Sequence, residues 1–404
     1  MANQNKTQLV IIFLTVFIYL VGFGVVIPII PVLSRDFGAT STQVGLMMSV
    51  YSFMQFLFSP FWGKMSDRVG RRPILLLCLL GEGASYLLFA SARSLEVLFL
   101  ARIFAGFFGA SISTASAYIS DITPQHERSK GMALIGAAFG LGFIIGPALG
   151  GWLAMWGQSI SSEPHFGTSF AALWVGGICF LNFLFGIKFL TESHKVKGQI
   201  RPQDLGRIKQ ILNYAKRPLL GSLMLIFLLG SLSMSAMEAT LILFVGEKFQ
   251  WGIKEVSFGF AYIGIIATFN QGFLVRKLLP KIGEKTMMLM GFSLMGLGLL
   301  GVSISNQIWI LAIMMTMFSF GHSFTNPSVL GSISVLAHEN EQGAALGTTQ
   351  GLASLGRIIG PAFGGFVYGA VHMVAPFVAG GLLCLVAVFL ILKNFKNLPE
   401  SAKR

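Results

Sequence analysis

The sequence predicts an all-α polytopic membrane protein whose twelve transmembrane helices form two pseudo-symmetric six-helix bundles. The 404 residues are 54% hydrophobic and only 11% charged, whereas soluble domains carry roughly a quarter charged residues. The mean hydropathy is +0.74. Apolar runs long enough for the about 20 residues that cross a bilayer alternate with short polar segments. A ten-residue pattern of the first half also returns in the second half.

The basic charge points to a membrane topology and not to a nucleic-acid partner. The formal net charge is +13, but the cations cluster in alternate polar segments, as in cytoplasmic loops. If the N-terminus is inside, the opposite side keeps only Arg35, Arg93, Lys248 and Lys254. We therefore expect a multi-pass protein of a bacterial-type inner membrane, with both termini in the cytoplasm and a lipid bilayer and a small molecule as partners.

The cysteines and the N-terminus carry no competing signal. Cys78, Cys179 and Cys384 lie within apolar runs, so we expect small buried residues and neither a disulfide framework nor a metal site. The first apolar run is too long for the apolar region of a signal peptide and lacks a convincing cleavage site, so we interpret it as helix 1.

Six apolar runs define the helices of the first bundle, residues 1–190. They span about residues 9–33, 43–62, 73–92, 95–120, 131–156 and 169–190. The segment from Gly63 to Pro73, called the signature run below, separates the second from the third. It carries four cations and one anion in eleven residues. Ionised groups are costly inside a bilayer, so we expect a tight cytoplasmic loop, which could serve topology alone.

The second half begins after a polar linker. Residues 191–218 are rich in Lys and Arg, and Leu205, Ile208, Ile211 and Leu212 have helical spacing, which is compatible with an amphipathic helix on the membrane surface. The second bundle, residues 219–404, is expected to hold helices at about residues 219–245, 256–275, 286–303, 307–330, 342–370 and 376–392.

The internal repeat supports two related halves. Gly142 to Gly151 reads G-F-I-I-G-P-A-L-G-G, and Gly356 to Gly365 reads G-R-I-I-G-P-A-F-G-G; the same register aligns Glu127 with Glu341. Glycines at every fourth position leave one helix face without side chains, so a neighbouring helix can pack closely, and each proline permits a bend. The residues of this packing motif are Gly142, Gly146, Pro147, Gly150, Gly151, Gly356, Gly360, Pro361 and Gly364.

Several motifs together resemble the major facilitator superfamily. The spacing G-x-x-x-D-R-x-G-R-R of the signature run is similar to the loop between its helices 2 and 3, and the run from Gly142 to Gly151 resembles the helix 5 motif of its antiporters. The chain is thus identified as similar to the twelve-helix drug:proton antiporters, both tetracycline exporters and multidrug exporters. This implies alternating access, a substrate bound near mid-membrane between the halves, and a proton as the coupling ion with no cofactor. We expect a monomer.

Charged groups within the apolar runs are functional candidates by default. Arg102, within Leu98 to Gly106, resembles the helix 4 motif in which an arginine is linked to proton transfer. Glu238 has a counterpart in helix 7 of the multidrug exporters, where a glutamate serves protonation and cation binding. Glu82 and Arg357 complete the set, and Arg357 has no evident partner. Each can instead be a structural, hydrogen-bonded group.

Two further polar residues share one face of the tenth helix. His322 and Asn326 are four residues apart, next to a proline. A single membrane histidine is more often hydrogen-bonded structure than a proton carrier, and we keep both readings open.

The signature run also implies a conformational latch. By resemblance, Asp67 caps the start of helix 11 and Arg71 reaches Asp121 at the end of helix 4, which together hold the outward-open state. The residues of this latch are Gly63, Asp67, Arg68, Gly70, Arg71, Arg72 and Asp121. Independent surface charges are the alternative.

The substrate is less defined than the family. The tetracycline exporters carry aspartates in helices 1, 3 and 9, where this chain has Tyr19, Ser85 and Met295. Glu238 and the many Phe and Met residues fit an exporter of lipophilic cations better, because such side chains adapt to several ligands. A tetracycline exporter or a metabolite transporter of the same fold remains the alternative. An ATP-driven permease would need a partner ATPase, and no metal-ligand spacing or serine nucleophile motif favours an enzyme.

Overall fold

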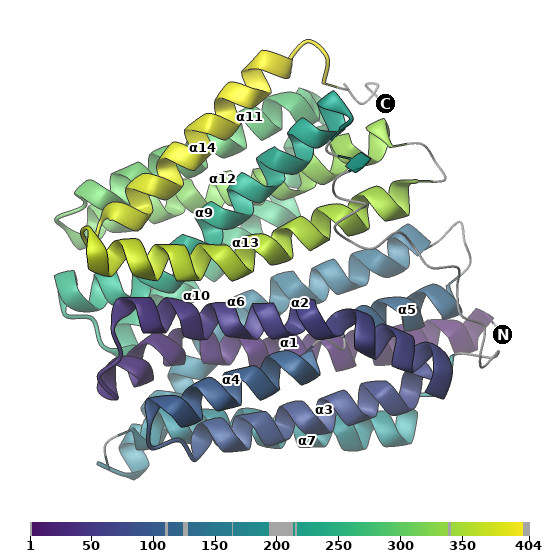
Figure 1. Ribbon diagram of the computed structural model, residues 1–404, viewed down its shortest axis with the longest axis vertical. Coiled ribbons are helices and arrows are strands. Elements are labelled where there is room, and N and C mark those ends of the chain that lie inside the picture. The colour runs from purple at the N-terminus through teal and green to yellow at the C-terminus, as the bar shows by residue number, and fades with distance from the viewer. Residues whose placement is uncertain are drawn as a thin grey trace. The chain divides into compact units, whose positions relative to one another are not determined.

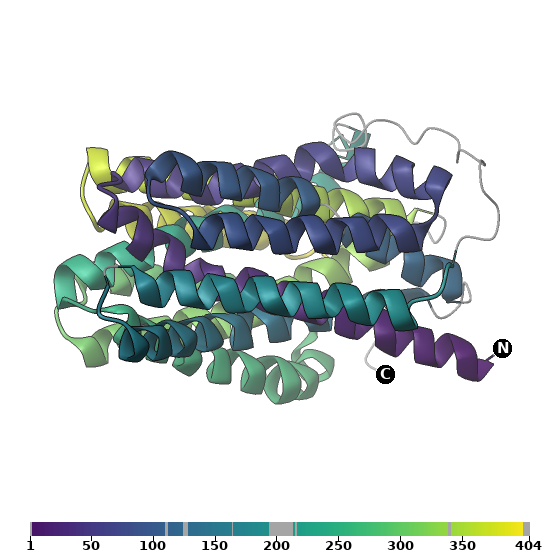
Figure 2. The same cartoon turned by 90° about the horizontal axis from the view of Figure 1, so that it is seen from below.

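The computed structural model describes residues 2–109, 112–123, 128–163, 165–193, 213–214, 216–337 and 341–398. Every regular element within these ranges is a helix, and the ribbon is labelled in Figure 1. Figure 2 turns the same ribbon by 90°. The chain divides into two compact units, which are treated separately below.

Unit 1 contains Met1–Ala39, Val50–Pro202 and Trp251–Gly264. Its helices are α1 (Ala2–Asp36), most of α2 (Ser41–Val69), α3 (Arg71–Ala90), α4 (Leu95–Gly109), α5 (Ile112–Ile122), α6 (Arg128–Ile160), α7 (Phe166–Phe189) and the first part of α10 (Ile253–Phe269). Helix α1 packs along α6, and α3 packs along α7 and α4. Cys78 and Cys179 are buried and free here, as expected from their apolar surroundings.

Unit 2 contains Thr40–Ser49, Gln203–Gln250 and Ile265–Arg404. Its helices are the start of α2, α9 (Pro218–Phe249), the end of α10, the π-helical turn η2 (Asn270–Val275), α11 (Arg276–Ile304), α12 (Ile308–Leu336), α13 (Gln342–Ala370) and α14 (Ala375–Asn394). Helix α11 packs on α12 and α14, and α9 packs on α13. Cys384 is buried and free. Helices α2 and α10 are each divided between the two units. The division into bundles at residues 1–190 and 219–404 stays a prediction.

Among the described residues, nine segments are long and apolar enough to cross a membrane. One of them, Ile253–Ile304, is 52 residues long and includes α10, η2 and α11. The nine do not include α6 or α13, so the expected number of twelve crossings stays a prediction. The all-helical membrane class itself is confirmed. The amphipathic segment expected at Leu205 to Leu212 lies outside the described residues.

The signature run is not the loop that its polarity predicted. Helix α2 continues to Val69, and α3 starts at Arg71, so Gly70 is the one residue between them. Gly70 has φ 120° and ψ 156°, a backbone conformation that residues with a Cβ rarely adopt. Charged residues end the apolar run but not the helix, because backbone hydrogen bonds continue where the chain leaves the hydrocarbon.

The second half repeats this turn with other charges. Gly283 also has a positive φ, of 75°, and it interrupts the helical backbone inside α11. When Gly283 is aligned with Gly70, Pro280 corresponds to Asp67 and Glu284 to Arg71. The backbone turn is therefore shared by the two halves, and so are three cations, since Lys277, Lys281 and Lys285 align with basic residues of the signature run. Asp67 and Arg71 have no counterpart of the same charge in the second half.

The repeated glycines lie where helices approach each other. On α6, Gly146 faces Gly24 of α1, and a Cβ added to Gly146 would lie 2.6 Å from the Gly24 Cα atom. On α13, Gly360 faces Ser235 of α9, and an added Cβ would lie 2.8 Å from the Ser235 Cβ atom. Both helices remain α-helical across Pro147 and Pro361. The remaining members of the motif have equally crowded neighbours, namely Gly142, Gly150, Gly151, Gly356 and Gly364.

Candidate functional site

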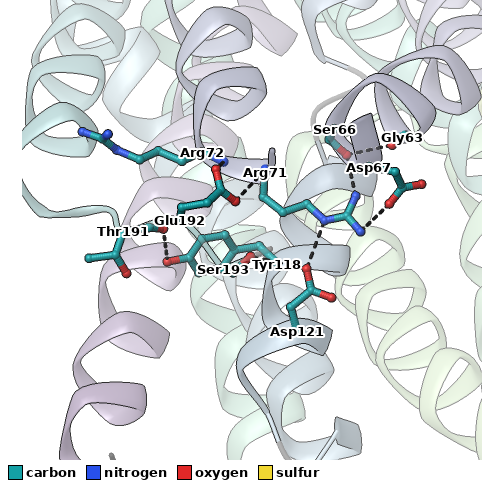
Figure 3. A network of polar contacts seen from close by, with 10 residues as sticks. All are labelled: Gly63, Ser66, Asp67, Arg71, Arg72, Tyr118, Asp121, Thr191, Glu192 and Ser193. Atoms are coloured by element: carbon teal, nitrogen blue, oxygen red, sulfur yellow. Dashed lines mark hydrogen bonds and ion pairs between the residues drawn. The ribbon is translucent and has the colours of Figure 1, made fainter. Parts of the chain in front are cut away.

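Arg71 is the centre of a polar network at the junction of α2, α3 and α5 (Figure 3). Its side chain is only 2% exposed. The Nε atom donates to Oδ2 of Asp121 at 3.1 Å, Nη1 donates to Oγ of Ser66 at 2.6 Å, and Nη2 lies 2.5 Å from Oδ1 of Asp67. The expected contact of Arg71 with Asp121 is thus present. Two carboxylates and a hydroxyl satisfy the three nitrogens of one buried guanidinium.

The other members of the signature run hold the helix ends. Oγ of Ser66 donates to the carbonyl of Gly63 at 2.8 Å. Nη2 of Arg72 donates to the carbonyl of Ile187 on α7 at 2.7 Å, and Arg68 is exposed. The expected cap of Asp67 on α13 would join the two units, and it stays a prediction.

Nothing in the sequence indicated that Glu192 belongs to this network, although its carboxylate completes it. Its carboxylate accepts hydrogen bonds from the backbone N–H groups of Arg71 and Arg72, at 2.9 and 3.2 Å. These are the first two residues of α3, whose N–H groups have no acceptor within their helix. Glu192 is 121 positions from Arg71, so no local spacing could have indicated the contact.

A second network is buried within unit 1, around Glu82 of α3 and Arg102 of α4. The two residues are 1% and 4% exposed, and their charges interact electrostatically. The hydroxyl of Tyr86 donates to Oε1 of Glu82 at 3.4 Å. Among the described residues, Oε2 of Glu82 and Nε of Arg102 have no hydrogen-bond partner. The structure therefore buries a carboxyl group and a guanidinium group, each with one atom that makes no hydrogen bond among the described residues.

Two tyrosines connect Arg102 to α1 and α2. The Arg102 guanidinium carbon lies 4.4 Å from the ring centroid of Tyr51, a cation–π arrangement. The hydroxyl oxygens of Tyr51 and Tyr19 are 2.7 Å apart, and Tyr19 donates to the carbonyl of Gly109 at 3.0 Å. Since the one proton of Tyr19 goes to that carbonyl, Tyr51 donates to Tyr19. Tyr51 and Tyr86 were not singled out from the sequence because tyrosines in apolar runs are ordinary.

Unit 2 holds the other intramembrane carboxylate. Glu238 of α9 is half-buried, and it interacts electrostatically with Arg357 of α13. Nη2 of Arg357 also donates to Oγ of Ser354 at 3.1 Å. The structure therefore supplies the partner that the sequence did not indicate for Arg357. Each unit now contains one acid–arginine pair within its apolar helices.

His322 and Asn326 do not join this pair. The imidazole of His322 is half-buried and stacks on the ring of Phe318, with centroids 6.2 Å apart and planes 4° apart. Asn326, one turn further along α12, is exposed. Among the described residues, no hydrogen bond or ring contact joins either side chain to Glu238. Their assignment as coupling residues stays a prediction.

The start of α13 is tied to the start of α9. Arg217 contacts Glu341 through two nitrogens, at 2.7 and 3.2 Å. The hydrogen bonds to this carboxylate raise the pKa of the Arg217 guanidinium. Both side chains are solvent-exposed, so water and salt screen the attraction between the two charges. Glu127, which the repeat aligns with Glu341, lies outside the described residues.

Each of the two helical units thus places an acid–arginine pair among helices long and apolar enough to cross a membrane or packed against them, which is compatible with a membrane transporter. The family model of the Major Facilitator Superfamily matches residues 12–283 and 277–404. The chain belongs to this superfamily. It is therefore a multi-pass membrane transporter and not an enzyme.

Named relatives cover nearly the whole chain. The class E tetracycline resistance protein of Escherichia coli is 32% identical over 91% of this chain and 89% of its own length. Multidrug resistance protein 2 of Bacillus subtilis is 29% identical over 98% and 97%. The crystal structure of the human organic anion transporter MFSD10 superposes with a TM-score of 0.71 at 25% identity, covering 96% of this chain and 99% of that one.

Proposed function

We propose that this protein is a proton-coupled antiporter that exports lipophilic cationic small molecules across a bacterial inner membrane. Protons move inward as the substrate moves outward, by alternating access between two bundles. The bundles are joined by a cytoplasmic linker, and both chain termini are cytoplasmic. The similarity to tetracycline and multidrug resistance proteins supports export.

The observation that carries the proposal is the acid–arginine pair in each unit. A carboxylate enclosed by apolar helices is costly when ionised, so its charge depends on what occupies its surroundings. Glu238 can be neutralised by a proton or by a cationic substrate, whereas Arg357 stays positive and limits the site to one added charge. Exclusion of one ligand by the other is sufficient to couple the two fluxes in opposite directions.

Glu82 serves as a proton site in the same scheme. One carboxylate oxygen contacts Tyr86, and the other has no partner among the described residues. Arg102 balances the carboxylate when the proton leaves. Tyr51 of α2 and Tyr19 of α1 link Arg102 to Gly109. Loss of the Glu82 proton would therefore alter the contacts of these two helices.

A tetracycline substrate is the second candidate. Five tetracycline resistance proteins, among them those of classes E and H, are 30 to 32% identical to the chain at about nine-tenths coverage. However, Tyr19, Ser85 and Met295 provide no carboxylate for a metal chelate. Tyr19 is engaged with Tyr51 and Gly109. Lipophilic cations therefore fit the buried groups better.

The signature run acts as the latch of the outward-open state in this proposal. Arg71 is held by Asp67 and Asp121, and Asp67 also caps the start of α13 when the latch closes. Asp67→Asn should insert normally but lose most of the transport. Unimpaired transport by this variant would leave the signature run with a topological role alone.

The test is ethidium efflux from pump-deficient bacteria that carry the gene. An ionophore that dissipates the proton gradient should abolish efflux while cellular ATP stays at its starting level. Cells that carry the empty vector give the background. Efflux that follows ATP and ignores the gradient would overturn proton coupling, and the absence of any added efflux across a panel of cations would overturn the substrate class.

A further inference from the structure

Thr191, Glu192 and Ser193 come directly after Leu190, the residue that caps α7, and they contact other parts of unit 1. Tyr118 donates its hydroxyl to the carbonyl of Thr191 at 2.8 Å, and the N–H of Thr191 donates to Oε1 of Gln8 at 3.2 Å. Ser193 donates its hydroxyl to Oδ2 of Asp121 at 3.3 Å. Thr191, Glu192 and Ser193, called the linker strap below, are the first residues of the segment expected to join the two bundles (Figure 3).

Glu192 attaches the strap to the signature run. Its two carboxylate oxygens accept the first two N–H groups of α3, from Arg71 and Arg72. A carboxylate is favoured at this end of a helix by the free N–H groups and the helix dipole. Gly70 leaves room for it, since a Cβ at Gly70 would overlap Oε2 of Glu192.

The strap and the latch share their acceptor. Oδ2 of Asp121 receives both Nε of Arg71 and the hydroxyl of Ser193. Arg71 is thus fixed at its backbone by Glu192 and at its side chain by Asp67 and Asp121. Any movement that separates Arg71 from Asp121 also disturbs the strap.

We propose that Glu192 is a positioning residue that makes the start of the linker part of the latch. The strap stays docked while Arg71 holds Asp121, and it leaves α3 when the latch opens. This inference rests on the proposed function for the transport step that the latch controls. The docking itself rests on the contacts of Thr191, Glu192 and Ser193 alone.

Glu192→Gln tests the role of the charge, and Glu192→Asp retains the charge on a shorter side chain. Glu163→Gln is the matched control, because Glu163 is an exposed carboxylate that precedes α7 at its opposite end. The purified proteins are placed in liposomes, and ethidium exchange is measured without a proton gradient. Limited trypsin cleavage after Lys195 or Lys197 of the linker reports docking.

We expect Glu192→Gln to lower the maximal exchange rate by about threefold to tenfold, the effect of losing one helix cap, with an unchanged half-saturating concentration of ethidium. Linker cleavage should accelerate by a similar factor. Glu192→Asp should recover part of both, and Glu163→Gln should match the parent. Unchanged cleavage would overturn the docking, and faster cleavage with a parental exchange rate would overturn the link to transport.

Gradient-free exchange also separates this inference from the proposed function. If the parent protein exchanges ethidium but cannot accumulate it against a gradient, proton coupling is wrong and the strap can still be correct. If the parent does not exchange ethidium at all, the proposed substrate class fails, whereas the cleavage assay still decides whether the strap is docked.

Discussion

At the scale of single residues, each unit carries one acid–arginine pair within its apolar helices. Glu82 and Arg102 are nearly inaccessible, and each has a side-chain atom without a partner among the described residues. An unsatisfied buried polar atom costs about 1–3 kcal/mol, and such groups are retained where a reaction needs them. Glu238 and Arg357 of unit 2 are half-buried instead, and they interact electrostatically.

Glu238→Gln should separate charge from shape. The amide keeps the size and hydrogen-bonding capacity of the carboxyl group but cannot attract a cation or exchange a proton. We expect ethidium export to fall by about tenfold or more, equivalent to about 1.4 kcal/mol, with less effect on the binding of a neutral substrate. Glu247→Gln, an exposed change on the same helix, is the control. Parental ethidium export by Glu238→Gln would remove Glu238 from the mechanism.

Asn270 gives a prediction about stability. It begins the π-helical turn η2 and is 0% exposed, and neither Nδ2 nor Oδ1 has a partner among the described residues. Asn270→Leu removes the unsatisfied amide and should raise the melting temperature in detergent, by a gain of about 1–3 kcal/mol. Gln271→Leu, at the exposed neighbouring position, should change it little. A lower melting temperature for Asn270→Leu would contradict this account.

The candidate residues were predictable one by one, but their partners were not. Glu82, Arg102 and Arg357 stand out because charge is rare in apolar runs. Tyr19, Tyr51 and Tyr86 come from three helices, α1, α2 and α3, and their contacts with the charged residues depend on packing that spacing does not reveal. The family pattern supplied the contact of Arg71 with Asp121, whereas no pattern supplied Glu192.

At the scale of elements, a single glycine sets the turn between α2 and α3. The backbone of Gly70 is unfavourable for any residue with a Cβ, and Glu192 occupies the space. Gly70→Ala should therefore destabilise the protein by about 1–3 kcal/mol. Gly63→Ala is the control, because Gly63 is helical and a Cβ there meets nothing within 4 Å. Thermal unfolding of both variants measures the difference. Equal melting temperatures would contradict the conclusion that the turn at residue 70 requires glycine.

The helices were predicted well where hydropathy alone defines them. Residues 376–392 were expected to form one helix, and α14 spans Ala375–Asn394. The errors lie at polar ends, since α2 continues seven residues beyond the predicted end at 62, to Val69. Hydropathy reports where the hydrocarbon ends, whereas the helix ends where backbone hydrogen bonding stops. The turn η2 inside the eighth predicted helix had no sequence signal.

At the scale of the whole molecule, the two halves share a plan with different charges. Gly70 and Gly283 make equivalent turns, and the glycine faces of α6 and α13 pack on α1 and α9. Each half places one acid–arginine pair in its helices, but only the first carries the signature run. The halves therefore provide similar scaffolds, and Asp67 and Arg71 of the proposed latch belong to the first half alone.

The proposed orientation can be checked on intact cells. Glu163→Cys lies between α6 and α7 and should react from outside with a thiol reagent that does not cross membranes. Lys64→Cys, at an exposed position of the signature run, should react only after the cells are opened. The reverse pattern would place both termini outside.

In the proposed mechanism, binding of a cation displaces protons from the carboxylates of Glu82 and Glu238. The most direct measurement is proton release from the purified protein in weak buffer when ethidium is added. The parent should release protons in a saturable manner, and the double variant Glu82→Gln with Glu238→Gln should bind more weakly and release none. Ethidium binding without proton release by the parent, or equal release by the double variant, would contradict the account.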